Sequence, residues 1–284
     1  MPVRASSVPA GARPYGRRVA VETEQYVPSR LRLVLVGLLA GTAAGMFGVG
    51  GGLVIVPALV AFCRRDQRQA VATSLLAIAP LAVFGVIGYA IHDEVDVLFA
   101  APLAVGSMIG AWLGAALLRR LSLRFLRTLF AVVTLGAAVR LLVDPGIPAG
   151  EVTHEPWGLV ALVPVGVAVG LLAGLSGIGG GAVMVPVLQL GFAVSAALAK
   201  GTSLLVILPT ALISGWRNRR AELGSIRDAA WIGLVGAGMT LAASAVSVRL
   251  SGTASDVLFG CFLLFVSLRP LWADFRDWRR RRSR

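Results

Sequence analysis

The chain has 284 residues, of which 57% are hydrophobic and 14% charged, and its mean hydropathy is +0.81. A composition this apolar excludes an ordinary soluble domain and predicts a protein whose solvent is lipid. The net charge of +13 would suit a nucleic-acid-binding protein, but the arginines gather in short connections and at both ends of the chain. They indicate membrane loops that face anionic headgroups, and no nucleic-acid partner is expected.

In chain order, the sequence predicts a basic tail expected to be disordered, then two similar sets of membrane helices, then a second basic tail. A polar, turn-rich linker expected to be external separates the two sets. The expected segments are a tail at 1–30, membrane repeat 1 at 31–143, a linker at 144–157, membrane repeat 2 at 158–273 and a cytoplasmic tail at 274–284. The expected apolar stretches are about 31–62, 70–90, 97–118 and 123–143, then 157–190, 199–216, 228–248 and 256–273.

The two sets are related by an internal repeat of 129 residues. The glycine-rich run Gly48–Pro57 returns as Gly177–Pro186. The same shift places Gly37, Gly41, Gly45, Thr73, Ser74 and Pro80 on Gly166, Gly170, Gly174, Thr202, Ser203 and Pro209. Two copies of a membrane unit that glycine and proline interrupt are typical of a transporter with its site between the copies.

The charge distribution predicts the orientation of the helices. The N-terminal tail, Arg64–Arg68, Arg119–Arg127, Arg217–Arg227 and the C-terminal tail are basic and are expected in the cytoplasm. The acidic segments 92–96 and 144–157 are expected outside. The predicted fold is therefore an all-α, polytopic protein of a bacterial inner membrane with both termini cytoplasmic. It contains two inverted repeats, each with a glycine-broken helical hairpin plus three transmembrane helices. Whether the hairpins cross fully or are re-entrant is left open.

The two glycine clusters are the first candidates for substrate binding. Consecutive glycines interrupt a helix, and backbone freed inside lipid is tolerated where it lines an enclosed cavity. N–H groups at the start of a returning helix form an anion site. The alternative is that the glycines serve close helix packing. The candidates are Gly48, Gly50, Gly51, Gly52, Gly177, Gly179, Gly180 and Gly181, with Pro57 and Pro186 as structural kinks.

Polar side chains near the clusters complete the candidate site. Hydroxyl donors are Thr73, Ser74, Ser176, Thr202 and Ser203, although such residues also bond helix backbone in membranes. Lys200 is the only lysine, and it stands where the first repeat has Val71. An ionisable group in an apolar helix is a functional candidate. The alternative for Lys200 is a lysine that snorkels to the membrane surface.

No catalytic residue, metal ligand or cofactor site is predicted. Gly174-Leu175-Ser176-Gly177 is similar to the Gly-x-Ser-Gly of rhomboid proteases, but that chemistry needs an intramembrane histidine base. The two histidines lie in predicted loops, so we expect a protein that is not an enzyme.

The doubled glycine-rich run ending in Val-Pro, each followed by a Thr-Ser-Leu helix, resembles the sulfite exporter TauE/SafE family over about residues 30–275. The resemblance implies an inner-membrane permease for sulfite, sulfonates or other small sulfur-containing anions. At the matching positions it implicates Gly48–Pro57, Gly177–Pro186 and the two Thr-Ser pairs.

The sequence therefore predicts a permease that moves a small anion by alternating access and without a cofactor, and the resemblance implies sulfite or an organosulfonate as that anion. Two other functions stay open. The carbonyls freed at the outgoing helix ends suit a cation or metabolite permease, and a non-transporting membrane scaffold or assembly protein needs no site at all. Which small anion is transported, the direction of transport, the coupling ion and the oligomeric state are left open.

Overall fold

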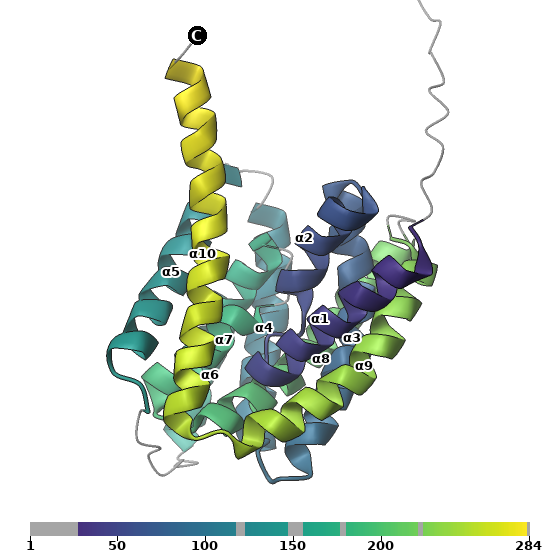
Figure 1. Cartoon of the computed structure of the whole chain (residues 1–284). Helices are drawn as coiled ribbons and strands as arrows, with labels where there is room; N and C mark the ends of the chain where they lie inside the picture. The colour runs from purple at the N-terminus through teal and green to yellow at the C-terminus, as the bar shows by residue number, and fades with distance from the viewer. Residues whose placement is uncertain (1–27, 118–122, 147–155, 177–179, 221–223, 283–284) are drawn as a thin grey trace, which may run out of the picture.

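The computed structural model describes residues 28–117, 123–146, 156–176, 180–220 and 224–282. Every regular element in these ranges is an α-helix (Figure 1). The first half contains α1 (Arg30–Phe47), α2 (Gly52–Cys63), α3 (Gln67–Ala90), α4 (Val97–Leu117) and α5 (Leu123–Val143). The second half contains α6 (Pro156–Ser176), α7 (Gly181–Phe192), α8 (Ala196–Arg220), α9 (Ile226–Arg249) and α10 (Gly252–Arg282).

The helix boundaries confirm the predicted all-helical, polytopic class. Each half starts with a helical hairpin that glycines break, and three further helices follow. The predicted N-terminal tail lies mostly outside the described residues, and α1 begins at its last residue, Arg30. The predicted C-terminal tail continues α10 as a helix through Arg282.

The two halves are interleaved, and their contacts are exchanged by the 129-residue shift. The most extensive helix contacts are those of α4 with α6 and of α1 with α9. Because the repeat matches α1 with α6 and α4 with α9, these two contacts are counterparts of each other. Gly37 of α1 lies against the carbonyl of Ile232, and its counterpart Gly166 of α6 lies against the carbonyl of Leu103. The exchange has the form that a two-fold relation between the halves requires. The predicted close-packing role of these glycines is confirmed.

Two further contacts place counterpart helices beside each other. α5 packs against α10 at one edge of the molecule, and α3 packs against α8 in the interior (Figure 1). Large apolar side chains remain exposed on the outer surface of the helices, among them Trp112 and Leu234. Within the described residues, four helices are long and apolar enough to cross a membrane, and six shorter apolar helices accompany them. The protein is therefore a multi-pass membrane protein whose exposed apolar surface suits lipid.

The first hairpin consists of a long helix that tilts across the molecule and a half-length helix that returns. α1 ends beside the last turns of α3 and α9, because Tyr89 and Ser247 bond carbonyls at its end. The chain then turns inward, so that Gly50 lies between Ile78 and Ile207, at the middle of α3 and α8. α2 has 12 residues, about 18 Å of helix, and starts at this central level.

Candidate functional site

The two glycine breaks meet at the centre of the molecule. A Cβ atom on Gly181 would lie 2.6 Å from the Cα of Val49 and 2.8 Å from the carbonyl oxygen of Gly48. No side chain fits at that spacing, so only glycine allows the start of α7 to approach the turn before α2. Val49 itself is fully buried. The described residues of the two glycine clusters therefore lie against each other in the interior.

Each returning helix begins at a glycine whose backbone lies in the left-handed region. Gly51 precedes α2 with φ of 77°, and Gly180 precedes α7 with φ of 80°. Neither glycine offers a side-chain cap, and the first-turn N–H groups of a helix have no acceptor within that helix. The positive ends of both helix dipoles therefore lie in the buried centre, as the anion-site hypothesis requires. Pro57 and Pro186 are each the sixth residue of their helix, and their role as structural kinks stays a prediction.

Hydroxyl groups from three helices cap the carbonyl end of α1. Tyr89 donates to the carbonyl of Gly45 at 2.6 Å, Ser247 to that of Met46 at 3.0 Å and Ser203 to that of Gly48 at 3.1 Å. Tyr89 and Ser203 are fully buried and Ser247 is almost so. The negative end of the α1 dipole is thus occupied by the protein's own donors. At this helix end, the occupation disfavours the cation site that freed carbonyls suggested in the sequence.

Lys200 lies beside this capped end and is 1% exposed. Its ammonium donates to the hydroxyls of Ser255 at 2.6 Å and Ser247 at 3.1 Å. The snorkelling alternative is therefore wrong, because α9 and α10 cover the ammonium. Lys200 also packs backbone to backbone on the first glycine break, since a Cβ atom on Gly48 would lie 2.6 Å from the Cα of Lys200. The sole lysine thus places a buried positive charge near the glycine break.

Two of the predicted hydroxyl donors accept hydrogen bonds from backbone amides that directly precede a helix. The Thr73 hydroxyl accepts a hydrogen bond from the amide of Ser225, and the Thr202 hydroxyl accepts one from the amide of Asp96. Ser225 and Asp96 are counterparts in the repeat, and each caps the start of a helix. The Ser225 hydroxyl accepts a hydrogen bond from the amide of Asp228 in α9, and the Asp96 carboxylate accepts one from the amide of Phe99 in α4. Each threonine therefore fixes the start of a helix from the other half of the protein. Their hydroxyl protons remain available to a ligand, so a substrate role stays a prediction.

The two serines of the Thr-Ser pairs differ in their bonding. Ser203 donates to the carbonyl of Gly48, whereas the hydroxyl of Ser74 is buried and has no hydrogen-bond partner within the described part of the chain. By the 129-residue repeat, the counterpart of the bond from Ser203 to Gly48 would join Ser74 to Gly177. That residue and Gly179 lie outside the described residues, and the side chain of Ser176 is not described. The contribution of these three residues to a site stays a prediction.

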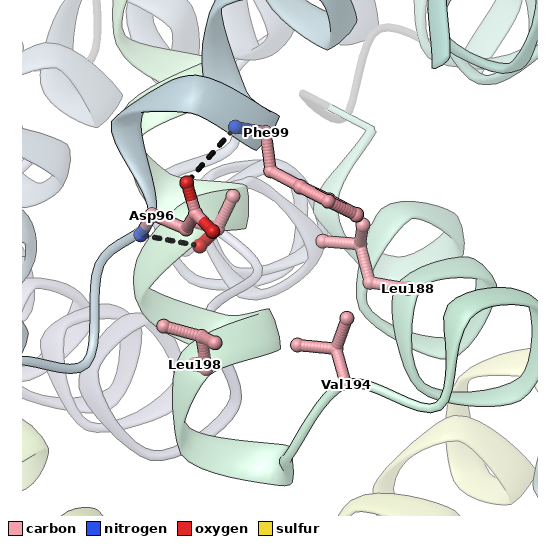
Figure 2. Close-up of a pocket in the computed structure, with 6 residues that line it drawn as sticks. Asp96, Phe99, Leu188, Val194 and Leu198 are labelled. Carbon is pink, nitrogen blue, oxygen red and sulfur yellow. Dashed lines mark hydrogen bonds between the residues drawn. The ribbon is translucent and has the colours of Figure 1, made fainter. Parts of the chain in front are cut away.

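The two ends of the molecule are closed differently. At the end expected in the cytoplasm, Arg65 after α2 bonds Asp228 of α9 through Nη2 at 2.6 Å and Nε at 3.1 Å. The counterparts at the opposite end are Val194 and Phe99. They line a small, mainly apolar pocket together with Asp96, Leu188, Leu198 and Thr202 (Figure 2). A partly buried ion pair therefore closes one end, and apolar side chains close the other.

Sequence reasoning missed a group of buried polar residues around Lys200. Ser247, Ser255, Gln189 and Asp256 are each 3% exposed or less. They lie on three helices, three of them within the predicted apolar stretches 157–190, 228–248 and 256–273 and Ser255 directly before the last. A polar side chain at a position where the repeat partner is apolar was the available signal. Gln189 and Ser255 show this signal, because their counterparts are Val60 and Leu126.

Comparison with known proteins identifies the group to which this architecture belongs. A family model described as sulfite exporter TauE/SafE matches residues 5–141 and 162–284. The chain belongs to the sulfite exporter TauE/SafE family. The matched segments cover both halves and therefore both glycine breaks.

The relatives of this TauE/SafE protein are described as probable membrane transporter proteins. YunE of Bacillus subtilis is 27% identical over 263 residues, which are 82% of this chain and 96% of the relative. A Haemophilus influenzae protein is 28% identical over 66% of this chain and 75% of its own length. A Xylella fastidiosa protein is 35% identical over 45% of this chain, and the match spans about half of that relative (51%). The chain is thus a member of a membrane transporter family.

Proposed function

We propose that the protein is a permease for small oxyanions, with sulfite or an organosulfonate as substrate, and that it works by alternating access. The observation that carries the proposal is the meeting of the two glycine breaks. It brings the start of α7 against the turn before α2, at the level of the middle of α3 and α8. Two helix N-termini and the ammonium of Lys200 then supply positive potential to one buried region.

The interleaving of the halves supports a mechanism in which one half rocks against the other. Gly45, Gly41 and Gly37 pack α1 on α9 of the other half without intervening side chains. Contacts between small residues permit sliding and rotation with little repacking. The ion pair at one end and the apolar pocket at the other are separate closures, as alternating access requires. The inverted orientation of the halves in the membrane, with both termini cytoplasmic, belongs to this proposal.

Counterflow in proteoliposomes tests the proposed function. Vesicles loaded with unlabelled sulfite should take up external radiolabelled sulfite, and vesicles without protein should not. The same vesicles should not exchange labelled Na⁺, which is the expected cargo of the rival cation permease. Gly51→Leu should abolish sulfite exchange, because a side chain there meets the Ala40 carbonyl, 2.9 Å from the Cβ position. Na⁺ exchange without sulfite exchange would overturn the proposal, and exchange of neither would favour a scaffold.

A further inference from the structure

The most unusual buried group of the described structure is a carboxylate at the start of α10. Asp256 is 2% exposed. Its Oδ1 accepts a hydrogen bond from Gln189 Nε2 at 2.8 Å, and its Oδ2 accepts one from the amide of Gly146 at 2.9 Å. Within the described part of the chain the carboxylate forms no ion pair. A buried carboxylate that is held only by neutral donors is costly, which indicates a function.

The repeat provides a comparison for the neighbours of Asp256. The positions that match Lys200, Gln189 and Ser255 in the first half hold Val71, Val60 and Leu126, whereas the position that matches Asp256 holds Arg127. Three of these four polar positions are therefore apolar in the first half, and the fourth carries the opposite charge. Replacing buried polar networks by apolar residues is often neutral or stabilising. The fold alone thus gives no reason for Lys200, Gln189 and Ser255 to be polar, and their presence around a buried carboxylate points to a ligand.

The charges of Lys200 and Asp256 indicate which ions would bind together at this buried group. Lys200 and Asp256 carry opposite charges and lie near enough to interact electrostatically, so the buried group is neutral overall. Among the described residues Lys200 donates two hydrogen bonds, to Ser247 and Ser255. An ammonium has three N–H donors, and the third is the one that a bound oxyanion would accept. An anion bound there would leave one net negative charge in a medium of low dielectric constant. Protonation of Asp256 removes that charge and keeps the group neutral.

The side chain of Gln189 fits both protonation states of Asp256. Its Nε2 faces the charged carboxylate, and its Oε1 is buried without a hydrogen-bond partner among the described residues. If Asp256 is protonated, rotation of the amide brings Oε1 round to accept the new O–H. Both carboxylate oxygens already accept N–H donors, which leaves few oxygen ligands for a metal cation. A proton therefore suits this site better than Na⁺.

The other charged groups near Asp256 are accounted for. On α8 the titratable group that faces it is Lys200, and on α7 its neighbour is the neutral Gln189. At the end of α5, near Gly146, Arg140 and Asp144 are paired with each other at 2.9 Å and are exposed to solvent. Among the described residues, Lys200 is thus the group whose charge is coupled to that of Asp256.

We propose that Asp256, oriented by Gln189 and Gly146, binds a proton whenever an oxyanion binds at Lys200, so that anion and proton cross the membrane together. This inference rests on the proposed oxyanion transport and names its coupling ion. One proton moves with each singly charged anion, and the pair carries no net charge. The anion then accumulates on the alkaline side of the membrane, by about tenfold for each unit of pH difference at equilibrium.

A transport experiment tests the coupling. Proteoliposomes with an imposed pH difference and no Na⁺ are given labelled methanesulfonate, whose single charge does not change in the working pH range, and labelled sulfite in parallel. Wild type should accumulate the probe on the alkaline side. Asp256→Asn should lose this accumulation but keep counterflow exchange, whereas the matched surface variant Asp144→Asn should behave as wild type. Accumulation by Asp256→Asn, or accumulation driven by a Na⁺ difference instead, would overturn the inference.

A second measurement needs no flux across a membrane. Difference infrared spectroscopy of the purified protein with and without bound methanesulfonate, at one pH, should show the C=O stretch of one protonated carboxylic acid that appears on binding, that Asp256→Asn lacks and that Asp144→Asn retains. Binding of methanesulfonate, measured by calorimetry, without a band that depends on Asp256 would overturn the inference and leave the proposed oxyanion transport standing. A lack of both binding and counterflow with every probe would refute the proposed oxyanion transport itself.

Discussion

Breaking the Arg65–Asp228 ion pair should open the end of the protein that is expected in the cytoplasm. Asp228 has 3% of its side chain exposed and Arg65 has 19%, and two nitrogen atoms of Arg65 contact one oxygen of Asp228. Removing one partner of a fully buried pair costs about 3–5 kcal/mol. Because Arg65 keeps part of its hydration, we expect about 2–3 kcal/mol here, which would shift the equilibrium towards the open state roughly 30- to 150-fold.

Cys63 is a built-in reporter of this opening. It is the last residue of α2, two residues before Arg65, and it is fully buried. In a Cys261→Ser background, which removes the exposed cysteine, maleimide should label Cys63 slowly. Arg65→Val and Asp228→Asn should each raise the labelling rate by the factor above. The two variants remove opposite charges, so a rise in both cannot come from a changed potential at the thiol.

Two controls separate local opening from unfolding and from side-chain loss. The double variant Arg65→Val with Asp228→Phe installs the residue types of the other half and leaves no unpaired charge. It should therefore label close to the wild-type rate. A cysteine at the buried position of Ser107, in the contact between α4 and α6, should stay unreactive in every variant unless the protein unfolds. Wild-type labelling of Cys63 in both single variants would refute the closing role of the ion pair.

Further expected outcomes concern the glycine breaks, the lysine, a loop carboxylate and the topology. Gly180→Leu should abolish sulfite exchange while the protein still reaches the membrane, whereas Gly238→Leu, which has nothing within 4 Å of its Cβ position, should exchange normally. Lys200→Met should weaken anion binding by about 1–3 kcal/mol and Arg140→Met should not, as calorimetry on the purified variants would show. Burial raises the pKa of the Glu94 carboxyl, although the Ser195 hydrogen bond and His92 oppose the rise. Glu94 therefore stabilises the fold below the ordinary glutamate range and loses that contribution as pH rises through its raised pKa. Glu94→Gln should consequently raise the melting temperature relative to wild type at neutral pH. If the melting temperature of the variant exceeds that of wild type by no more at neutral pH than at acidic pH, the expected direction of the pKa shift is wrong. Reporter fusions should place residue 284 in the cytoplasm and the 144–157 linker outside, and the opposite result at either point would refute the inverted topology.

The helices were predictable because their boundaries are marked in the local sequence. Gly48–Gly52 ends α1 and starts α2 through backbone conformations that only glycine adopts easily, and the repeat doubles the signal. Short charged connections such as 92–96 mark the other boundaries. These signals need no knowledge of which helix packs on which.

The partners of the site residues were not predictable, because they depend on how the two halves interleave. Thr73 and Thr202 looked like ligand donors, yet each hydroxyl accepts an amide from a loop of the other half. Lys200 looked as if it lay at a surface, since the sequence does not show that α9 and α10 cover it. Asp256 stood near the start of an apolar stretch, and only the fold brings it to Gln189.

The most direct test of alternating access is sulfite counterflow before and after the two halves are tied together. Cysteines at positions 65 and 228, in a background without Cys63 and Cys261, can be joined by a short, reducible cross-linker across the contact of Arg65 with Asp228. Cross-linking should stop sulfite exchange in proteoliposomes, and reduction should restore it. Exchange at the full rate by fully cross-linked protein would contradict transport through alternate opening at this contact.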